Sequence, residues 1–420
     1  MVSNKIKHIG FIGVVVLFIL VTSSCHKTDS GSNNVTSEKR TVIVYMAADN
    51  NLEYFAMQNI NDMEQGWDST MGNLIVYVNG GNGASPPYPV IYQIKHDTSS
   101  QIVSTIKWVY PSQNSCDPGV FNKVLSDIMA QYPSSSYGLV LWSHGSAWYP
   151  AGAQFGSTLT IDTFSIGHTT NSLFSINQGS PYALPLTKSF GLDGSSELGI
   201  PDLENSLPTK FDFILFDACY MGSLEVSYQL KDKAQYIIAS PTEVLSTGFP
   251  YNKIVPFMFS NNLPEALFNI GDAYFNFYND QSGVWQSASV SVVNTSQLNN
   301  LSIAANKIFS NKSVDTLFNI DSIQQYEVTQ SGYLYDLSDV FNHINVPDSL
   351  RENFFSALNK SVIYKKSTSR ILDCFDIKNY SGLNVYIPYN QNLAYYDYYK
   401  TLDWYLQSGD SFFWDRCIIQ

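Results

Sequence analysis

The chain has 420 residues, and 44% of them are hydrophobic, which is enough for one large globular domain or two ordinary ones. Its formal net charge is −13, although only 14% of its residues are charged. This balance argues against nucleic acid as a partner, because binding to phosphates needs clustered Lys and Arg side chains.

The N-terminal residues 1–25 have the pattern of a targeting signal rather than of folded structure. Basic Lys5 and Lys7 precede an apolar stretch over 9–21 that is short for a membrane span. Small residues then lead to Cys25, a pattern that is similar to a bacterial lipoprotein signal. We therefore expect a lipid on Cys25 that holds the protein on a membrane of the bacterial cell envelope, outside the cytoplasm. An ordinary secretory signal is the alternative.

Three further regions are expected after this signal. Residues 26–39 are polar and predict a flexible tether. Residues 40–300 predict the main domain, and residues 301–420 predict a smaller C-terminal subdomain that packs on it.

Strand and helix patterns alternate along the main domain. The order predicts an α/β fold with a mostly parallel central sheet and helices on both faces. Residues 145–209 interrupt it with a long Gly-, Ser- and Thr-rich insertion, and such insertions are usually functional or flexible. The expected strands are 41–46, 73–79, a hairpin over 89–94 and 102–110, 137–142, 211–216, 234–240 and 287–293, and the expected helices are 52–65, 117–132, 222–230, 250–279 and 298–310.

Cys219 stands at the end of the apolar strand 211–216, where a parallel sheet binds its ligands. A helix that begins directly after it would lower the pKa of the thiol, and a thiolate is the reactive form. Taken alone, a buried core cysteine is the more ordinary interpretation. Asp217 alters this balance because alternation places residues 217 and 219 on the same side of an extended strand. Its charge would raise the pKa of the thiol, which indicates that the carboxylate serves a substrate.

His144 ends the second apolar strand, 137–142, and is followed by Gly145. A glycine there lets backbone N–H groups approach a substrate carbonyl closely. An imidazole and a thiol at two strand ends could meet in one cleft, as a Cys–His hydrolase requires.

Four segments, at 41–52, 139–148, 211–225 and 236–251, resemble the clostripain family of cysteine peptidases. The first three read TVIVYMAADNNL, LVLWSHGSAW and FDFILFDACYMGSLE. The resemblance implies a caspase-like α/β sandwich, a fold shared with legumains and gingipains. It also implies a catalytic dyad of His144 and Cys219, and cleavage of proteins or peptides after Arg or Lys with Asp217 at the floor of the S1 pocket.

The roles of these residues then follow from their chemistry. Cys219 would attack the scissile carbonyl, and the backbone N–H groups of Gly145 and Cys219 would hold the oxyanion. His144 would protonate the leaving amine and later activate water.

The pocket departs from the family pattern at one position. Family members often carry Gly-aromatic-Asp-Tyr after the strand that follows the cysteine, whereas this chain has Pro250 in place of the acid. Glu243 is a candidate substitute in substrate binding. If both Glu243 and Asp217 point elsewhere, a neutral P1 preference follows.

The insertion also suggests self-processing, because relatives are often activated by cleavage between the His and Cys motifs. Lys188 lies there in a loop-like stretch, and Lys210 abuts the strand before Cys219. We therefore predict cleavage after Lys188. An uncut loop that covers the cleft is the alternative.

Other function classes have weaker support. A glycan- or peptide-binding surface lipoprotein would have no reason to keep both strand-end motifs. A peptidase fold that has lost its activity is a variant of this alternative. A serine hydrolase is disfavoured because the chain has no Gly-x-Ser-x-Gly elbow at a strand-to-helix turn. The absence of a Cys-x-x-Cys or Cys/His cluster predicts no metal site, and no cofactor is expected. No loop has EF-hand spacing, so a need for Ca²⁺ cannot be read from the sequence.

Overall fold

The computed structural model describes residues 39–81, 84–151, 189–311, 320–327, 333–387 and 393–408. The expected signal over 1–25 with Cys25, most of the tether, and Lys188 lie outside these residues. Within the described ranges, no helix combines the length and apolarity that a membrane crossing requires.

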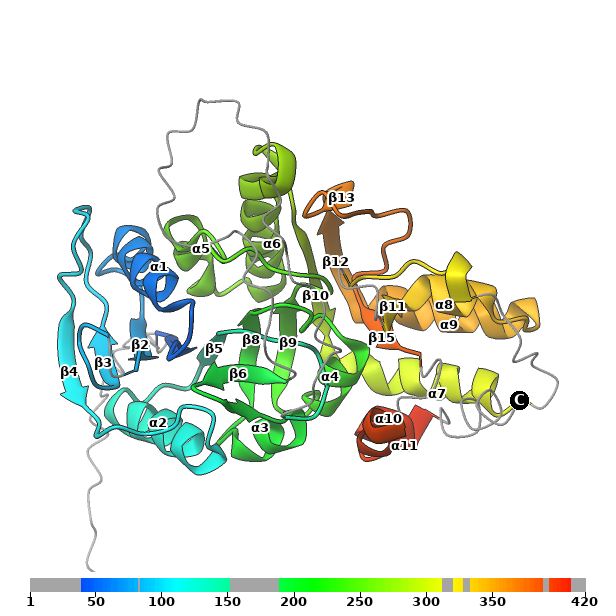
Figure 1. Cartoon of the computed structure of the whole chain (residues 1–420), viewed down its shortest axis with the longest axis horizontal. Helices are drawn as coiled ribbons and strands as arrows, with labels where there is room; N and C mark the ends of the chain where they lie inside the picture. Colours follow the sequence, from blue (N-terminus) through cyan, green and yellow to red (C-terminus); the bar gives the residue numbers. More distant parts are fainter. Residues whose placement is uncertain are drawn as a thin grey trace, which may run out of the picture. The chain divides into compact units, whose positions relative to one another are not determined.

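The described residues form a central sheet with the strand order β12-β10-β9-β8-β5-β1-β2-β3-β4 (Figure 1). Its middle strands run parallel, and they are buried along nearly their whole length. Continuous apolar runs suit such strands because both faces of a parallel sheet are covered. The predicted mostly parallel α/β fold is confirmed. The parallel strands are β1 (Thr41–Ala47), β2 (Asn73–Asn79), β5 (Tyr137–Trp142), β8 (Phe211–Asp217) and β9 (Ala234–Ala239).

Antiparallel strands extend the sheet at both edges. The predicted hairpin is present as β3 (Val90–Gln93) and β4 (Thr105–Val109), which continue the sheet beyond β2. At the other edge, β10 (Ser289–Asn294) pairs with β9, and β12 (Val362–Ser367) pairs with β10. The last strand belongs to the region expected as a C-terminal subdomain, so that region contributes to the main sheet.

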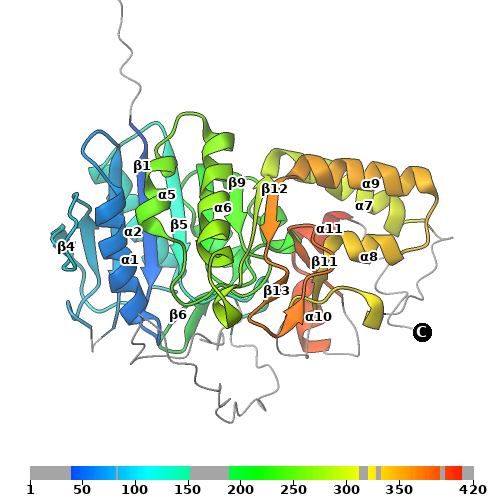
Figure 2. The same cartoon turned by 90° about the horizontal axis from the view of Figure 1, so that it is seen from above.

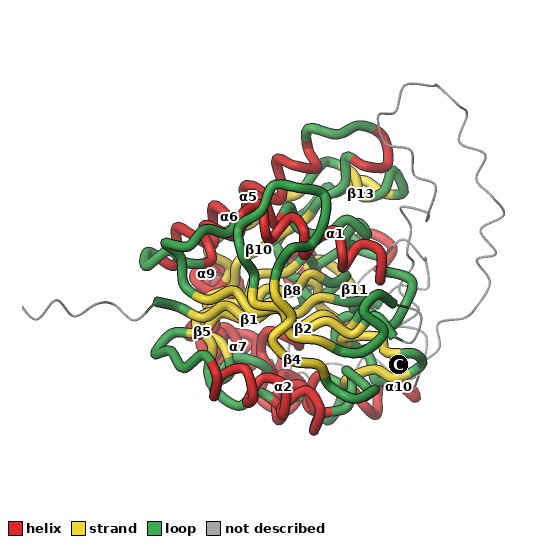
Figure 3. The backbone as a smooth tube through the Cα atoms, turned by 90° about the vertical axis from the view of Figure 1, so that its left-hand side faces the viewer, coloured by secondary structure: helices red, strands yellow, loops and turns green. Residues whose placement is uncertain are grey.

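One face of the sheet is covered by α1 (Glu53–Gly66), α5 (Tyr251–Met258) and α6 (Leu263–Asn279) (Figures 2 and 3). Helix α1 buries Ala56, Ile60 and Met63, which helical spacing places on one side. The sequence predicts one helix over 250–279, but the structure has two. Pro264 explains the break, because a proline fits the first turn of a new helix and disfavours helical geometry before it.

The opposite face is covered by α2 (Pro118–Gln131), α3 (Ile200–Ser206) and α4 (Leu224–Gln229). Helix α2 starts as the sequence predicts: the Asp117 side chain accepts a hydrogen bond from the Val120 N–H, and Pro118 takes the first helical position. Both layers bury the apolar side chains that alternate across the strands.

The remaining elements lie after residue 294. The boundary near residue 300 stays a prediction, since the described residues belong to one compact unit. The helices are α7 (Leu298–Phe309), α8 (Leu337–His343), α9 (Asp348–Ser361), α10 (Leu393–Tyr399) and α11 (Asp403–Ser408). Two small sheets pair β11 (Leu334–Asp336) with β15 (Asn384–Tyr386), and β13 (Arg370–Ile371) with β14 (Phe375–Asp376).

Candidate active site

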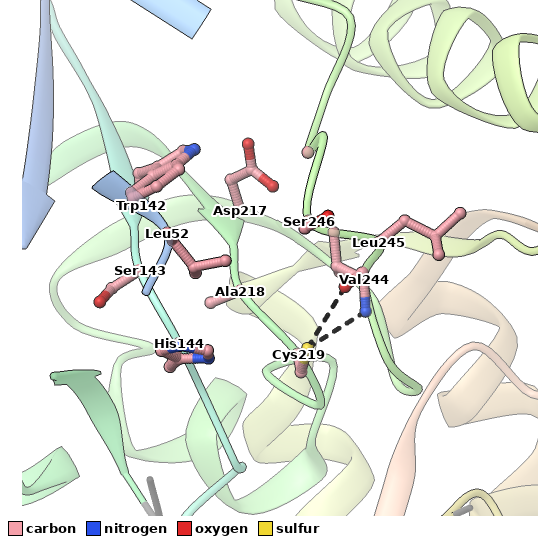
Figure 4. Close-up of a pocket in the computed structure, with 11 residues that line it drawn as sticks. Leu52, Trp142, Ser143, His144, Asp217, Ala218, Cys219, Val244, Leu245 and Ser246 are labelled. Carbon is pink, nitrogen blue, oxygen red and sulfur yellow. Dashed lines mark hydrogen bonds between the residues drawn. The ribbon is translucent and has the colours of Figure 1, made fainter. Parts of the chain in front are cut away.

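Two neighbouring parallel strands end at one pocket. Strands β5 and β8 are in a register that sets Trp142 opposite Asp217, and the segments that follow carry His144 and Cys219. Because the carboxyl ends of parallel strands meet at the same edge of a sheet, the imidazole and the thiol line the same pocket. Figure 4 shows them on opposite sides of it. The other lining residues include Leu52, Ser143, Val244, Leu245, Ser246 and Gly248.

Gly145 lies where the two strand-end segments come closest. A Cβ atom at this position would be 2.8 Å from the Cys219 carbonyl oxygen and 3.0 Å from Cγ of Met221. A larger residue would push the histidine segment away from the cysteine segment. Glycine is therefore needed for the close approach of the two segments.

A hairpin that the sequence did not predict supports the histidine segment. It consists of β6 (Phe190–Asp193) and β7 (Ser196–Leu198), inside the insertion over 145–209. The Gly191 N–H donates to the His144 carbonyl at 3.0 Å. Short strands within a Gly- and Ser-rich stretch carry little periodicity, which is why the pattern missed them.

The same hairpin leaves the Gly145 amide available. Gly145 and Phe190 form an antiparallel bridge, and the flanking Ser146 N–H donates to the Ser189 carbonyl at 3.0 Å. In such a pair, the N–H and C=O of the central residue point away from the partner strand. The Gly145 N–H is therefore not used by the hairpin, as an oxyanion donor requires.

Asn51 is a site residue that the sequence reasoning missed. Its Oδ1 atom lies 2.7 Å from Nε2 of His144, so the imidazole donates from Nε2 to the amide oxygen. The neutral ring then carries its proton on Nε2, and Nδ1 is left as the basic nitrogen. The available signal was position: Asn51 follows β1, the parallel neighbour of β5.

Burial sets the protonation states of His144 and Cys219. Desolvation lowers the pKa of His144 to about 4. Desolvation also raises the pKa of the Cys219 thiol to about 12, opposed by the Val244 N–H and supported by the Glu243 and Asp217 charges. At neutral pH the pair is therefore a thiol and an uncharged imidazole.

The thiol lies against the backbone of Val244. The Val244 N–H donates to Sγ at 3.2 Å, and Sγ lies 3.5 Å from the Val244 carbonyl oxygen (Figure 4). The helix expected over 222–230 is present as α4 (Leu224–Gln229), but it does not begin directly after Cys219, because residues 220–223 separate the two. The expected lowering of the thiol pKa by a helix N-terminus is therefore wrong, and burial decides the direction.

Asp217 and the Cys219 thiol both line the pocket. Its Oδ2 atom accepts hydrogen bonds from the Phe249 N–H at 3.1 Å and the Tyr251 hydroxyl at 2.9 Å. Burial raises the pKa of this carboxyl to about 6, and both hydrogen bonds oppose that rise. The carboxyl is thus mainly ionised at pH 7, with both of these bonds on one oxygen.

Gly248 allows the loop to pass over this carboxylate. Its φ is 66°, a left-handed conformation that favours glycine. A Cβ atom there would lie 2.4 Å from Oδ2 of Asp217. Any side chain at position 248 would therefore collide with the acid.

Glu243 is not among the residues that line the pocket. Its side chain is buried and accepts a hydrogen bond from the Tyr220 hydroxyl. The structure therefore brings His144, Cys219 and Asp217 together and directs Glu243 elsewhere. Among the described residues, no group of three or more His, Cys, Asp or Glu side chains could hold a metal ion.

A thiol and an imidazole at the carboxyl ends of two adjacent parallel strands, with a buried acid in the same pocket, define a site of the cysteine-hydrolase class. The model of the clostripain family matches residues 44–171 and 177–418. The chain belongs to the clostripain family of cysteine peptidases.

Individual relatives agree with this assignment. Clostripain of Hathewaya histolytica is 27% identical over 254 residues, a match that covers 54% of this chain and 43% of clostripain. The match thus spans less than half the length of that relative. A secreted C11 cysteine protease from Bacteroides thetaiotaomicron, solved with an irreversible peptide inhibitor, has a TM-score of 0.70 at 28% identity, covering 90% of this chain and 99% of its own. An inactive zymogen C11 protease from Parabacteroides distasonis has a TM-score of 0.69 at 28% identity, covering 88% and 97%.

Proposed function

We propose that the protein is a cysteine endopeptidase that uses Cys219 as nucleophile and His144 as acid and base. The observation that carries the proposal is the shared pocket at the ends of β5 and β8, with the His144 proton held on Nε2 by Asn51. This tautomer leaves Nδ1 to take the thiol proton, a requirement for a pair that is neutral at rest.

The reaction follows from these roles. As the Cys219 sulfur bonds to the scissile carbonyl carbon, its proton moves to His144. The carbonyl oxygen becomes an oxyanion, for which the N–H groups of Gly145 and Cys219 are the proposed donors. Collapse of this intermediate breaks the C–N bond, and His144 gives its proton to the leaving amine. Water, deprotonated by His144, then hydrolyses the thioester and releases the thiol.

Asp217 supports cleavage after Lys or Arg. The carboxylate is buried in the pocket wall, and both recorded hydrogen bonds fall on Oδ2. Oδ1 can then accept from a cationic P1 side chain, and a charge-assisted bond of this kind is stronger than a neutral one. Pro250 stands where an acid is often found, and Glu243 accepts a hydrogen bond from Tyr220, so Asp217 is the one acid among the described residues that line the pocket.

The same proposal includes an anchor and self-processing. A secreted relative and the lipoprotein-like signal support an extracytoplasmic enzyme, lipid-anchored at Cys25. Cleavage after Lys188 is supported by the next residue, Ser189, whose carbonyl is bonded to Ser146 beside the histidine. Two fragments from wild type and one intact chain from Cys219→Ala would support processing, and an active single chain would contradict it.

The test is a fluorogenic peptide panel that differs only at P1, with Arg, Lys, Asn, Asp or Ala. It is run on wild type, Cys219→Ala and the matched variant Cys116→Ala, which removes a buried thiol that does not line the pocket. We expect cleavage of the Arg and Lys peptides by wild type and Cys116→Ala only. Activity in Cys219→Ala would overturn the assignment of Cys219 as the nucleophile. A preference for the Ala peptide would overturn the assignment of the pocket to basic P1 residues. If no form of the protein cleaves any peptide, a binding protein is favoured.

A further inference from the structure

The C-terminal strand β15 is joined to the turn that carries the nucleophile. Asn384, fully buried, donates its backbone N–H to the Gly222 carbonyl at 2.9 Å. It also forms a parallel bridge with Ser223. Two positions later, the Tyr386 N–H donates to the Glu225 carboxylate at 2.9 Å. Strand β15 therefore contacts the turn that follows Cys219, although the two segments are far apart in the sequence.

The Asn384 side chain connects two walls of the active site. Its Nδ2 donates to the Tyr220 carbonyl at 3.0 Å and to the Pro241 carbonyl at 2.9 Å. Tyr220 follows the nucleophile, and Pro241 begins the loop that carries Val244 against the thiol. One buried amide thus fixes the distance between the cysteine turn and the loop that covers it.

The turn needs such support because its backbone is unfavourable. Tyr220 has φ of 62°, a left-handed conformation that is unfavourable for a residue with a side chain. Backbone bonds from Tyr220 N–H to Thr242 O and from Gly222 N–H to Ser240 O, both 2.8 Å, also join the turn to the loop. Strained residues persist where their surroundings over-determine them, and they cluster at functional sites.

We propose that Asn384 is a positioning residue for catalysis: through the Tyr220 and Pro241 carbonyls it holds the Cys219 backbone N–H where the oxyanion forms. The C-terminal region is then part of the catalytic apparatus rather than an appendage. The inference rests on Cys219 being the nucleophile. Donors to an oxyanion act only when fixed in place, so a small displacement of the turn should slow the chemical step more than it weakens substrate binding.

The test compares Asn384→Asp, which replaces the donating NH₂ with an oxygen of similar size, with wild type. The control is Thr295→Val. Thr295 is also buried and donates to the carbonyls of Ala234 and Gln235, but these lie at the opposite end of β9. Each variant is assayed for kcat and KM on the best peptide of the panel, for iodoacetamide alkylation of Cys219, and for melting temperature.

We expect Asn384→Asp to lower kcat between about 10- and 100-fold. KM and the alkylation rate should change less than about threefold, because alkylation forms no oxyanion. Thr295→Val should have a lower melting temperature than wild type but an unchanged kcat. Wild-type kcat in folded Asn384→Asp, or equal losses of kcat and alkylation, would overturn the proposal. If Asn384→Asp does not fold, Asn384→Ser gives the same test without a charge. Activity in the Cys219→Ala variant would instead overturn the assignment of Cys219 as the nucleophile.

Discussion

The proposed catalytic pair and the proposed substrate pocket are built by different means. His144 and Cys219 follow strands whose register is fixed by the sheet, and Gly145 permits their close approach. The substrate pocket depends on the loop after β9, where Gly248 passes over Asp217. In the proposed enzyme, the sheet therefore determines where the chemistry occurs, whereas the loop determines which P1 side chain is accepted.

Gly145→Ala should have the largest effect, and it should disturb the catalytic pair without altering the substrate pocket. The added Cβ would lie 2.8 Å from the Cys219 carbonyl oxygen, so the two segments must separate. We expect kcat to fall at least about 100-fold for every P1 residue, because misplacement of about 1 Å has that effect. Gly194→Ala is the control for an added methyl group: its φ of 60° disfavours a side chain, but no atom lies within 4 Å of an added Cβ. Unequal losses across P1 residues would break the distinction between the two regions.

Asp217→Asn should disturb the proposed substrate pocket and leave the catalytic pair in place. Loss of a charge-assisted bond worth ~1.5–3 kcal/mol should lower kcat/KM for Lys and Arg peptides about 10- to 100-fold. The Ala peptide should change less than threefold. Wild type should show the same change with pH: as pH falls through about 6, the Asp217 carboxyl gains a proton, and the preference for Lys over Ala declines.

Tyr251→Phe serves as the control for this pH effect. It removes a hydrogen bond that lowers the pKa of Asp217 and keeps the charge. The midpoint of the pH-dependent preference should therefore move to higher pH. An unchanged preference between pH 5 and 8 in wild type would show that Asp217 does not select the P1 residue.

Asn51→Ala has the smallest expected effect, because it alters only the orientation of the imidazole. We expect kcat to fall about 5- to 20-fold with KM little changed, as a positioning contact within general acid–base catalysis predicts. Asn51→Asp should raise the pKa of His144 by placing a carboxylate beside Nε2, and so move the acid limb of the kcat profile to higher pH. A kcat and pH profile identical to wild type in both variants would remove Asn51 from the site.

The placement of His144 and Cys219 could largely be predicted from the sequence. Much less of the substrate pocket could be predicted. Apolar runs ending on His144 and Cys219 predicted neighbouring strands because the carboxyl ends of parallel strands share an edge. The support from β6 and β15 could not be predicted, since these short strands lack a periodic pattern and Asn384 is 165 positions from Cys219 (384 − 219). Glu243 was predicted from proximity in sequence, but a loop side chain can turn either way, and here it faces Tyr220.

Cys219 and His144 are proposed to form one catalytic site. The most direct measurement is labelling of the full chain by an irreversible peptide inhibitor with Lys at P1, followed by mass spectrometry of the digested protein. We expect one label, on Cys219. It should be lost in His144→Ala and reduced in Asp217→Asn, whereas Cys116→Ala should label normally. A label on Cys116 or Cys374, or a label on Cys219 that does not depend on His144, would contradict this proposal.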